Sequence, residues 1–309
     1  MDNMLHISAS PHIHSGRSTT SIMRDVIISL LPATVAGVVI FGLRALLVIA
    51  VCVITCVLLE ALYNVIMKKD QTVGDLSAAV TGLLLGLNIP SGIPIWQCVV
   101  GSAFAILLVK CIFGGIGCNL VNPAITARVF MLVSFGSMAT QSMPVWVDTS
   151  SGATPLAQIA AEDTPALTDL LIGSYGGAIG ETCSVALLAG FAYLLIRRII
   201  TWHIPVSFVA SVFVLSFLFE GFDVVNATAL ILSGGLFIGA IFMATDYVTS
   251  PATASGKLIF GIGAGILTFL IRHFGVYPEG VSFAILFMNI LTPYIERLTA
   301  HKVFGGVKA

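Results

Sequence analysis

The chain has 309 residues, of which 57% are hydrophobic and 9% charged, and its mean hydropathy of +1.03 is far above that of a soluble domain. A formal net charge of −1 excludes a nucleic-acid-binding protein, because such a protein needs a strongly basic surface. The composition therefore predicts an integral membrane protein that lies in a lipid bilayer.

The first half of the chain contains a polar start and five apolar runs. Residues 1–25 are polar and lack the pattern of a cleaved signal peptide, so we expect them to form a cytoplasmic N-terminal segment. Asp25 is expected to cap the first helix, where a carboxylate complements the helix dipole. Five apolar runs follow, and each is long enough, or nearly so, to cross a hydrocarbon layer of about 30 Å. They cover residues 26–42, 45–67, 75–89, 93–112 and 121–136.

A polar loop, residues 137–177, separates these runs from a second set of five. The second set occupies residues 178–296, and a short basic tail, residues 297–309, follows it. None of the runs shows the period-two alternation of barrel strands, so the expected fold class is an all-α integral membrane protein with about ten transmembrane helices. The second set covers residues 178–196, 203–219, 225–244, 257–275 and 280–295.

The positions of Lys and Arg predict the orientation in the membrane. If the N-terminus is cytoplasmic, eleven of the fourteen basic residues, Lys110 among them, lie on the cytoplasmic side. Only Arg44 and Arg272 lie outside, and Arg128, inside the fifth run, is left uncounted. The C-terminus is then cytoplasmic too, and the loop 137–177, which has acidic residues but no Lys or Arg, is extracytoplasmic.

A faint internal repeat relates the third and eighth runs. The segments SAAVTGLLLGLNIP and ALILSGGLFIGAIF align so that Gly82 and Gly86 fall on Gly235 and Gly239, with a shift of one residue. An offset of five helices gives the two copies opposite orientations, which indicates an inverted repeat of five helices each with a central site. Alternatively, the glycines serve close packing between helices.

Two stretches rich in Gly or Pro interrupt the apolar runs near the predicted cytoplasmic face. They are GGIGCNLVNPA, residues 114–124, and ATDYVTSPA, residues 244–252. Non-helical backbone at membrane depth is tolerated only where protein buries it or water lines it. Both stretches are therefore candidate binding segments.

Ionisable side chains inside apolar runs are a second signal of function, because a charge in hydrocarbon is costly. Glu60 lies seven residues before Met67, about 10 Å along a helix, which is too deep for its carboxylate to reach water. We predict an ion pathway that uses Glu60 and Asp246 as cation ligands or proton carriers. The alternative for Glu60 is a structural ion pair with an intramembrane arginine.

The polar loop contains the sequence DTSSGATP, residues 148–155. Gly152 permits a tight turn, and the position before Pro155 favours an extended conformation, so Thr154 would hold its hydroxyl on a stiff loop. Residue chemistry alone favours an ordinary polar turn, because a hydroxyl is a poor nucleophile without a base or a metal.

The same loop resembles a known modification site. Its pattern D-x-x-S-G-A-T is similar to the acceptor at which a flavin transferase attaches FMN, through a phosphoester, to a threonine. The residues concerned are Asp148, Ser151, Gly152, Ala153 and Thr154.

Four further segments resemble the Nqr B-subunit and Rnf D-subunit family of membrane redox pumps. The Rnf D-subunit is the more similar, because Nqr B-subunits have a much longer polar segment before the first span. The segments are SPHIHSGRSTTSIMRDVIISLLPA, GDLSAAVTGLLLGLNIP, GIGCNLVNPAITARVF and LSGGLFIGAIFMATDYVTSP.

The resemblance implies a covalent FMN on Thr154 and a second, non-covalent flavin, either riboflavin or another FMN. The two broken stretches are the expected site of the second flavin, although NPA within the first of them could simply start the fifth helix. The candidate ligands of this flavin are Asn119, Asn122, Thr126, Arg128, Thr245 and Asp246.

The function implied by the resemblance is that of a flavin-carrying subunit in an Rnf-type complex, which couples electron transfer between ferredoxin and NAD to Na+ or H+ movement. Its location would be the cytoplasmic membrane of a bacterium or archaeon, and its partners the other Rnf-type subunits and a flavin transferase. The sequence has no Rossmann glycine pattern and no iron–sulfur cysteine spacing, so partners would bind ferredoxin and NAD. The alternatives are a channel or secondary transporter for a small solute, and a purely structural assembly subunit.

Overall fold

The structure is a computed structural model that describes residues 18–139, 142–147, 155–160, 165–219, 221–275 and 279–300. Within these ranges every regular element is helical, and the one β feature is an isolated bridge between Ser142 and Gly177. In the first half, the helices are α1 (Thr19–Phe41), α2 (Leu43–Ile66), η1 (Val73–Asp75), α3 (Ser77–Leu87), α4 (Ile95–Ala103), η2 (Phe104–Cys111), α5 (Pro123–Ser134) and η3 (Gly136–Ala139). They continue with α6 (Pro155–Ala160), α7 (Leu167–Ile172), α8 (Ser184–Ile196), α9 (His203–Phe219), α10 (Val224–Leu232), α11 (Leu236–Ile238), η4 (Gly239–Met243), α12 (Ala254–Phe274) and α13 (Val281–Thr299).

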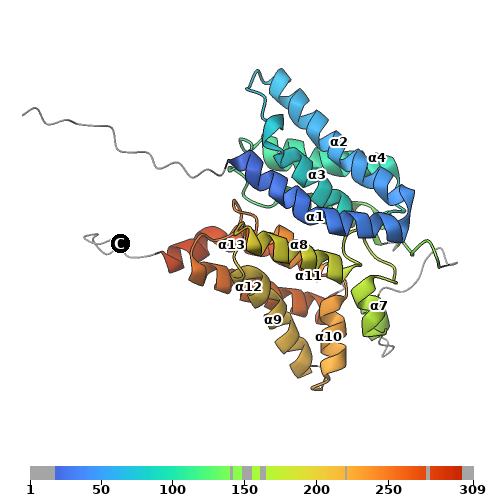
Figure 1. The fold of residues 1–309 in the computed structure, drawn as a ribbon. Helices are drawn as coiled ribbons and strands as arrows, with labels where there is room; N and C mark the ends of the chain where they lie inside the picture. Colours follow the sequence, from blue (N-terminus) through green and yellow to red (C-terminus); the bar gives the residue numbers. More distant parts are fainter. Residues whose placement is uncertain are drawn as a thin grey trace, which may run out of the picture.

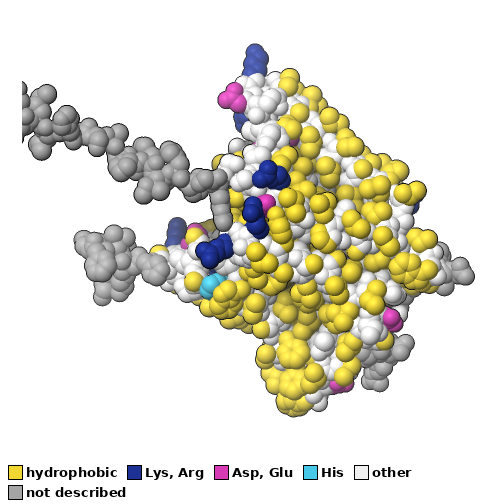
Figure 2. Space-filling view, in the orientation of Figure 1, with side chains coloured by type: hydrophobic (Ala, Val, Ile, Leu, Met, Phe, Trp, Pro, Cys, Tyr) yellow, Lys and Arg dark blue, Asp and Glu magenta, His cyan; other side chains and the backbone are white. Residues whose placement is uncertain are grey.

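Each of the ten predicted apolar runs coincides with a helix or a pair of consecutive helices. By length and composition, α1, α2, α12 and α13 can each cross a membrane alone, and α10 with α11–η4 forms a pair bent by 64°. The other five segments are shorter apolar helices. Figure 2 shows hydrophobic side chains over most of the visible face, while Lys and Arg gather towards its left and upper edges. The chain is therefore an all-helical integral membrane protein.

The prediction that Asp25 caps the first helix was wrong. α1 begins earlier, at Thr19, because the Ser18 side chain accepts a hydrogen bond from the backbone of its first turn. Asp25 is buried and instead forms an ion pair with Arg197, with 3.1 Å between Oδ2 and Nη2. Its Oδ1 also accepts a hydrogen bond from the Tyr193 hydroxyl at 3.1 Å. These contacts join the start of α1 to the end of α8.

The two halves of the chain pack on each other through helices that are equivalent under the five-helix offset. α1 packs along α8, and α5 packs on α13. In Figure 1 the helices of the first half lie above those of the second half, with α1 and α8 between them. Contacts between equivalent helices are expected around a twofold axis in the membrane plane, so this packing supports the inverted repeat.

The glycines that suggested the repeat have different surroundings in the two halves. A Cβ atom added to Gly82 or Gly86 would lie 2.7 or 3.0 Å from a Cα atom of α2, so both glycines allow α3 to lie directly on α2. Gly235 lies at the break between α10 and α11, and Gly239 faces α13. Close helix packing therefore explains Gly82 and Gly86.

Gly190 is a point of close approach between α8 and α1. A Cβ atom there would lie 2.3 Å from the Ser29 carbonyl oxygen and 2.9 Å from the Phe242 ring. We expect Gly190→Ala to lower the free energy of unfolding by about 1–3 kcal/mol, because the α1 backbone cannot move away easily. Thermal unfolding in detergent measures this, with Gly136→Ala as the matched control, since nothing lies within 4 Å of its added Cβ. Equal stabilities of the two variants would contradict the prediction.

Candidate functional site

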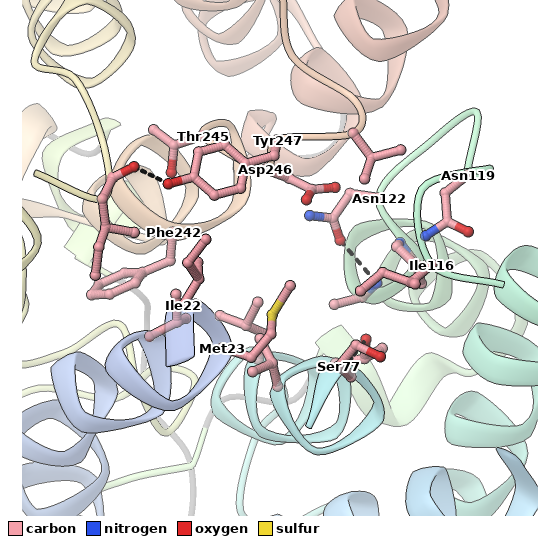
Figure 3. Close-up of a pocket in the computed structure, with 18 of the residues that line it drawn as sticks. Ile22, Met23, Ser77, Ile116, Asn119, Asn122, Phe242, Thr245, Asp246 and Tyr247 are labelled. Carbon is pink, nitrogen blue, oxygen red and sulfur yellow. Dashed lines mark hydrogen bonds between the residues drawn. The ribbon is translucent and has the colours of Figure 1, made fainter. Parts of the chain in front are cut away.

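A cleft lies where the two broken stretches meet (Figure 3). α1 and α3 form one side of it, and residues 116–124 and 242–248 form the others. Much of the lining is apolar, and Met23 points its side chain towards the centre. The polar lining residues are Ser77, Thr81, Lys110, Asn119, Asn122, Thr245, Asp246 and Tyr247.

Asn122 starts α5 and also joins the two broken stretches. Its Oδ1 accepts hydrogen bonds from the N–H groups of Ala124, at 3.0 Å, and Ile125, at 3.3 Å, with Pro123 at the first helical position. The interpretation of NPA as a helix start is thus confirmed. The Nδ2 group of Asn122 donates to the carbonyl oxygen of Met243 at 3.2 Å, and this hydrogen bond connects the first broken stretch to the second.

Asn289, in α13, connects the same two stretches from a third side. With its amide oriented to satisfy its neighbours, Nδ2 donates to the Thr249 carbonyl and Oδ1 accepts from the Asn122 N–H, both at 3.2 Å. The Thr292 hydroxyl donates to the same Thr249 carbonyl at 2.9 Å. Asn289 was not predicted, although an asparagine in the middle of the apolar run 280–295 was a usable signal; the structure buries it.

One polar group in the cleft, Asn119, indicates a bound partner. Asn119 Oδ1 is buried and accepts no hydrogen bond from any residue that the structure describes. Such an orphaned acceptor calls for a water or a ligand. Asp246 lies opposite, on the second stretch, and accepts a hydrogen bond from the Thr249 hydroxyl at 3.1 Å (Figure 3).

The structure brings together most, but not all, of the residues predicted for a second flavin. Four of the six line the cleft: Asn119, Asn122, Thr245 and Asp246. Thr126 lies one turn inside α5, where its hydroxyl donates to the Asn122 carbonyl at 2.7 Å, and it does not line the cleft. Arg128 lies further along α5 in a separate cluster of charges.

Glu60 forms a buried ion pair with Lys110 rather than with an arginine. Lys110 Nζ lies 2.9 Å from both carboxylate oxygens, and the Thr72 hydroxyl donates to Oε1 at 2.8 Å. Lys110 also donates to Ser77 Oγ at 2.6 Å, and both of these residues line the cleft. Only 2% of Lys110 is exposed. Glu60 is therefore connected to the cleft through Lys110.

Widened helical turns lead into the cleft from both halves of the chain. η2, which continues α4, is a π-helical segment that contains Lys110. η4, which continues α11, is also π-helical and ends just before Thr245. π-helical turns are rare, and they occur frequently at functional sites.

A second group of buried charges surrounds the break between α10 and α11. Arg128 Nη1 donates to Ser282 Oγ at 3.0 Å, while its Nη2 pairs with Glu279 and lies 3.6 Å from Glu181 Oε2. Sequence analysis missed both carboxylates. The usable signal was their position, since Glu181 lies within the run 178–196 and Glu279 directly before the run 280–295.

Arg272 holds the other side of the break. Its guanidinium donates to the carbonyl oxygens of Leu230, at 2.6 Å, and Ser233, at 3.1 Å, which lie at the end of α10. These carbonyls have no helical partners beyond the break, so a charged donor compensates for the lost hydrogen bonds. Gly234 follows in a left-handed conformation with a φ of +68°, which turns the chain into α11.

The acceptor motif, residues 148–154, lies outside the described residues, and its role stays a prediction. Pro155 follows it directly, is buried, and begins α6. Leu156 lies against the break, because a Cβ atom added to Gly234 would be 3.0 Å from Leu156 Cδ1 and 3.2 Å from Arg272 Nη2. The helix that follows the motif therefore packs at the end of α10.

The chain is similar to known proteins along nearly its whole length. A family model described as NQR2, RnfD, RnfE family matches residues 6–305. The D-subunit of the Na+-translocating ferredoxin:NAD+ oxidoreductase complex of Acetobacterium woodii is 46% identical over 98% of this chain and 96% of its own length. The D-subunit of the proton-translocating ferredoxin:NAD+ oxidoreductase complex of Clostridium ljungdahlii is 38% identical over 98% of this chain and 97% of its own. The D-subunit of the ion-translocating oxidoreductase complex of Aliivibrio salmonicida is 35% identical, with shares of 98% and 99%.

Proposed function

The chain belongs to the NQR2, RnfD, RnfE family, and from that premise we propose that it is a flavin-carrying membrane subunit of a complex that couples electron transfer between ferredoxin and NAD to Na+ or H+ movement. The observation that carries the proposal is the similarity to the D-subunits of such complexes over nearly the whole chain. Other subunits of the complex bind ferredoxin and NAD, because this sequence contains no pattern for either. A channel or a solute transporter has no comparable support.

The proposed orientation places both termini and the cleft on the cytoplasmic side of a bacterial or archaeal membrane. α1 begins and α13 ends at the left side of Figure 1. Exposed basic residues lie directly after α2, at Lys68 and Lys69, and after α8, at Arg197 and Arg198. A concentration of Lys and Arg is typical of the cytoplasmic face. The loop 137–177 then belongs to the outer face.

Covalent FMN on Thr154 is the second element of the proposal. The D-x-x-S-G-A-T pattern of residues 148–154 supports it, and the attachment requires a separate flavin transferase. FMN supplies one-electron and two-electron redox chemistry, while the protein determines its position. The packing of α6 against α10 holds the chain next to Thr154 close to the outer end of the bundle.

The cleft suits a second, non-covalent flavin, either riboflavin or FMN. Its apolar walls suit an aromatic ring system, and its few polar groups can fix the orientation of a ligand. The pyrimidine edge of a flavin presents N–H and C=O groups side by side. The orphaned Oδ1 of Asn119 and the adjacent NH2 group can pair with both.

Substitution of Asn119 tests this placement. We expect Asn119→Leu to weaken the binding of the non-covalent flavin about tenfold, because the lost amide leaves the polar edge of the ligand unpaired. The measurement is the flavin released by acid from the purified complex, per mole of chain. Thr126→Val is the matched control, since Thr126 lies near the cleft but does not line it. Unchanged release from Asn119→Leu would refute the placement.

Glu60 and Asp246 form the proposed ion pathway. Asp246 is part of the cleft wall, and Lys110 connects Glu60 to the same cleft. A flavin held in the cleft would lie beside Lys110 and would supply the electron-transfer chemistry. The Glu60–Lys110 ion pair would respond strongly to a charge there, because the interior has a low dielectric constant.

A further inference from the structure

Glu181 is a buried carboxylate with one unsatisfied oxygen. Its side chain is 3% exposed, and Oε1 accepts a hydrogen bond from the Ala178 N–H at 3.0 Å. Oε2 accepts no hydrogen bond from the described part of the chain, and a Cβ atom added to Gly235 would lie 3.0 Å from it. Burying a charged oxygen without a donor is expensive, so this atom needs a partner.

Arg128 is the nearest cation, but it is already occupied. Its Nη2 is 3.6 Å from Glu181 Oε2, beyond hydrogen-bonding distance, and pairs with Glu279 instead. Its Nη1 donates to Ser282 Oγ at 3.0 Å. A single guanidinium is therefore shared unequally between a fully buried carboxylate and one whose side chain is 20% exposed.

The remaining charge at this place, Arg272, is also compensated. It donates to carbonyl oxygens at the end of α10, where the helix dipole is negative, and its Nε lies 3.4 Å from the Glu279 carbonyl oxygen. Arg272 is held by these carbonyls, and Arg128 donates to Glu279 while its Nη2 stays 3.6 Å from Glu181 Oε2, so no described group donates a hydrogen bond to that oxygen. A neutral Glu181 avoids the cost of a buried, charged oxygen that has no donor.

We propose that Glu181 binds a proton at Oε2. Whether the proton stays bound depends on whether Arg128 pairs with Glu279 or with Glu181. When Arg128 turns to Glu181, the O–H bond of the carboxylic acid breaks and the proton passes to water at the exposed side of Glu279. A sodium ion fits less well, because it needs several oxygen ligands and would lie beside a guanidinium.

The site lies at the break that leads into the cleft wall. Gly235 precedes α11, and Thr245, ten residues further along the chain, lines the cleft. A change of charge at Glu181 alters the force on the first turn of α11, since the added Cβ position of Gly235 is close to both Glu181 and Arg128. Within the proposed function, on which this role rests, Glu181 is a proton-binding residue at the start of the segment that leads from Gly235 to the cleft wall.

Infrared spectroscopy of the purified full chain tests proton binding without any electron transfer. We expect the wild type to show the C=O stretch of a protonated carboxylic acid at neutral pH, with a shift in D2O, and Glu181→Gln to lack it. Glu60→Gln is the matched control, because Lys110 donates to both oxygens of Glu60 and leaves neither of them unsatisfied; its spectrum should retain the band.

A third variant tests the role of Arg128. Glu279→Gln releases Arg128 towards Glu181 and removes a nearby negative charge, so the band should titrate at a pH lower by about one unit or more than in the wild type. This measurement also decides the matter if Glu181→Gln does not fold.

Three outcomes overturn the proposal. They are a band that survives Glu181→Gln, a titration that Glu279→Gln leaves unmoved, and a band that disappears when NaCl replaces KCl at constant pH. The last would show that sodium occupies the site. None of these results depends on flavin content or on activity, so a failure here is separate from a failure of the proposed function.

Discussion

Thr154→Ala is expected to remove all covalently bound flavin from the chain. A phosphoester to FMN needs the threonine oxygen, and an alanine offers no atom that can replace it. The chain should still fold, because Pro155 is buried next to the motif and Leu156 keeps its contact at the end of α10. Fluorescence under ultraviolet light, recorded in a denaturing gel after co-expression with a flavin transferase, measures the effect.

A matched variant separates loss of the attachment atom from general damage to the loop. Thr149→Ala removes a hydroxyl from the same loop at a variable position of the D-x-x-S-G-A-T pattern, and its fluorescence should equal that of the wild type. If Thr154→Ala stays fluorescent, the flavin is attached elsewhere. If no variant is fluorescent although the transferase is active, the loop is an ordinary turn.

Glu60→Gln is expected to reduce Na+ or H+ transport by the complex about tenfold or more, with little change in flavin content. The amide keeps the shape of the side chain and can still accept from Thr72 and Lys110, so the fold should persist. Its neutral oxygen cannot balance Lys110, and a tenfold loss corresponds to about 1.4 kcal/mol in the barrier. The measurement is ion uptake by inverted membrane vesicles during ferredoxin oxidation by NAD+.

Asp70→Asn is the control for this substitution, because Asp70 is an exposed acid in the turn after α2. Transport should be unchanged in that variant. A purely structural role for Glu60 predicts normal transport in every complex that assembles, so an unchanged rate in Glu60→Gln would remove it from the ion pathway.

Segments of the fold could be predicted because hydropathy depends on local composition alone. All ten apolar runs correspond to helices or, in one case, to a bent pair of helices. Helix ends were harder, since the start of α1 depends on a cap at Ser18 and not on Asp25, whose partner Arg197 is 172 positions away in the sequence. Nothing in one local segment reveals a contact of that kind.

In the candidate site, too, contacts between residues that are distant in the sequence could not be predicted. Asn119, Asn122, Thr245 and Asp246 could be identified as polar groups in two broken stretches, but their meeting in one cleft is a property of the packed helices. Lys110 lies near the end of the run 93–112, and its partner Glu60 is 50 positions away in the sequence. Arg128 pairs with Glu279, which lies 151 positions from it, and local sequence does not reveal such a contact.

The short helices beside the cleft have an electrical consequence. α3 has 11 residues and α5 has 12, so each spans about 16–18 Å, little more than half of a hydrocarbon layer of about 30 Å. Where polar surroundings reach the ends of such helices, the membrane voltage falls over this shorter distance. The local field is then nearly twice that of the surrounding bilayer. Since 100 mV acts on one elementary charge with about 2.3 kcal/mol, an ion needs to move only a short way here to perform most of that work.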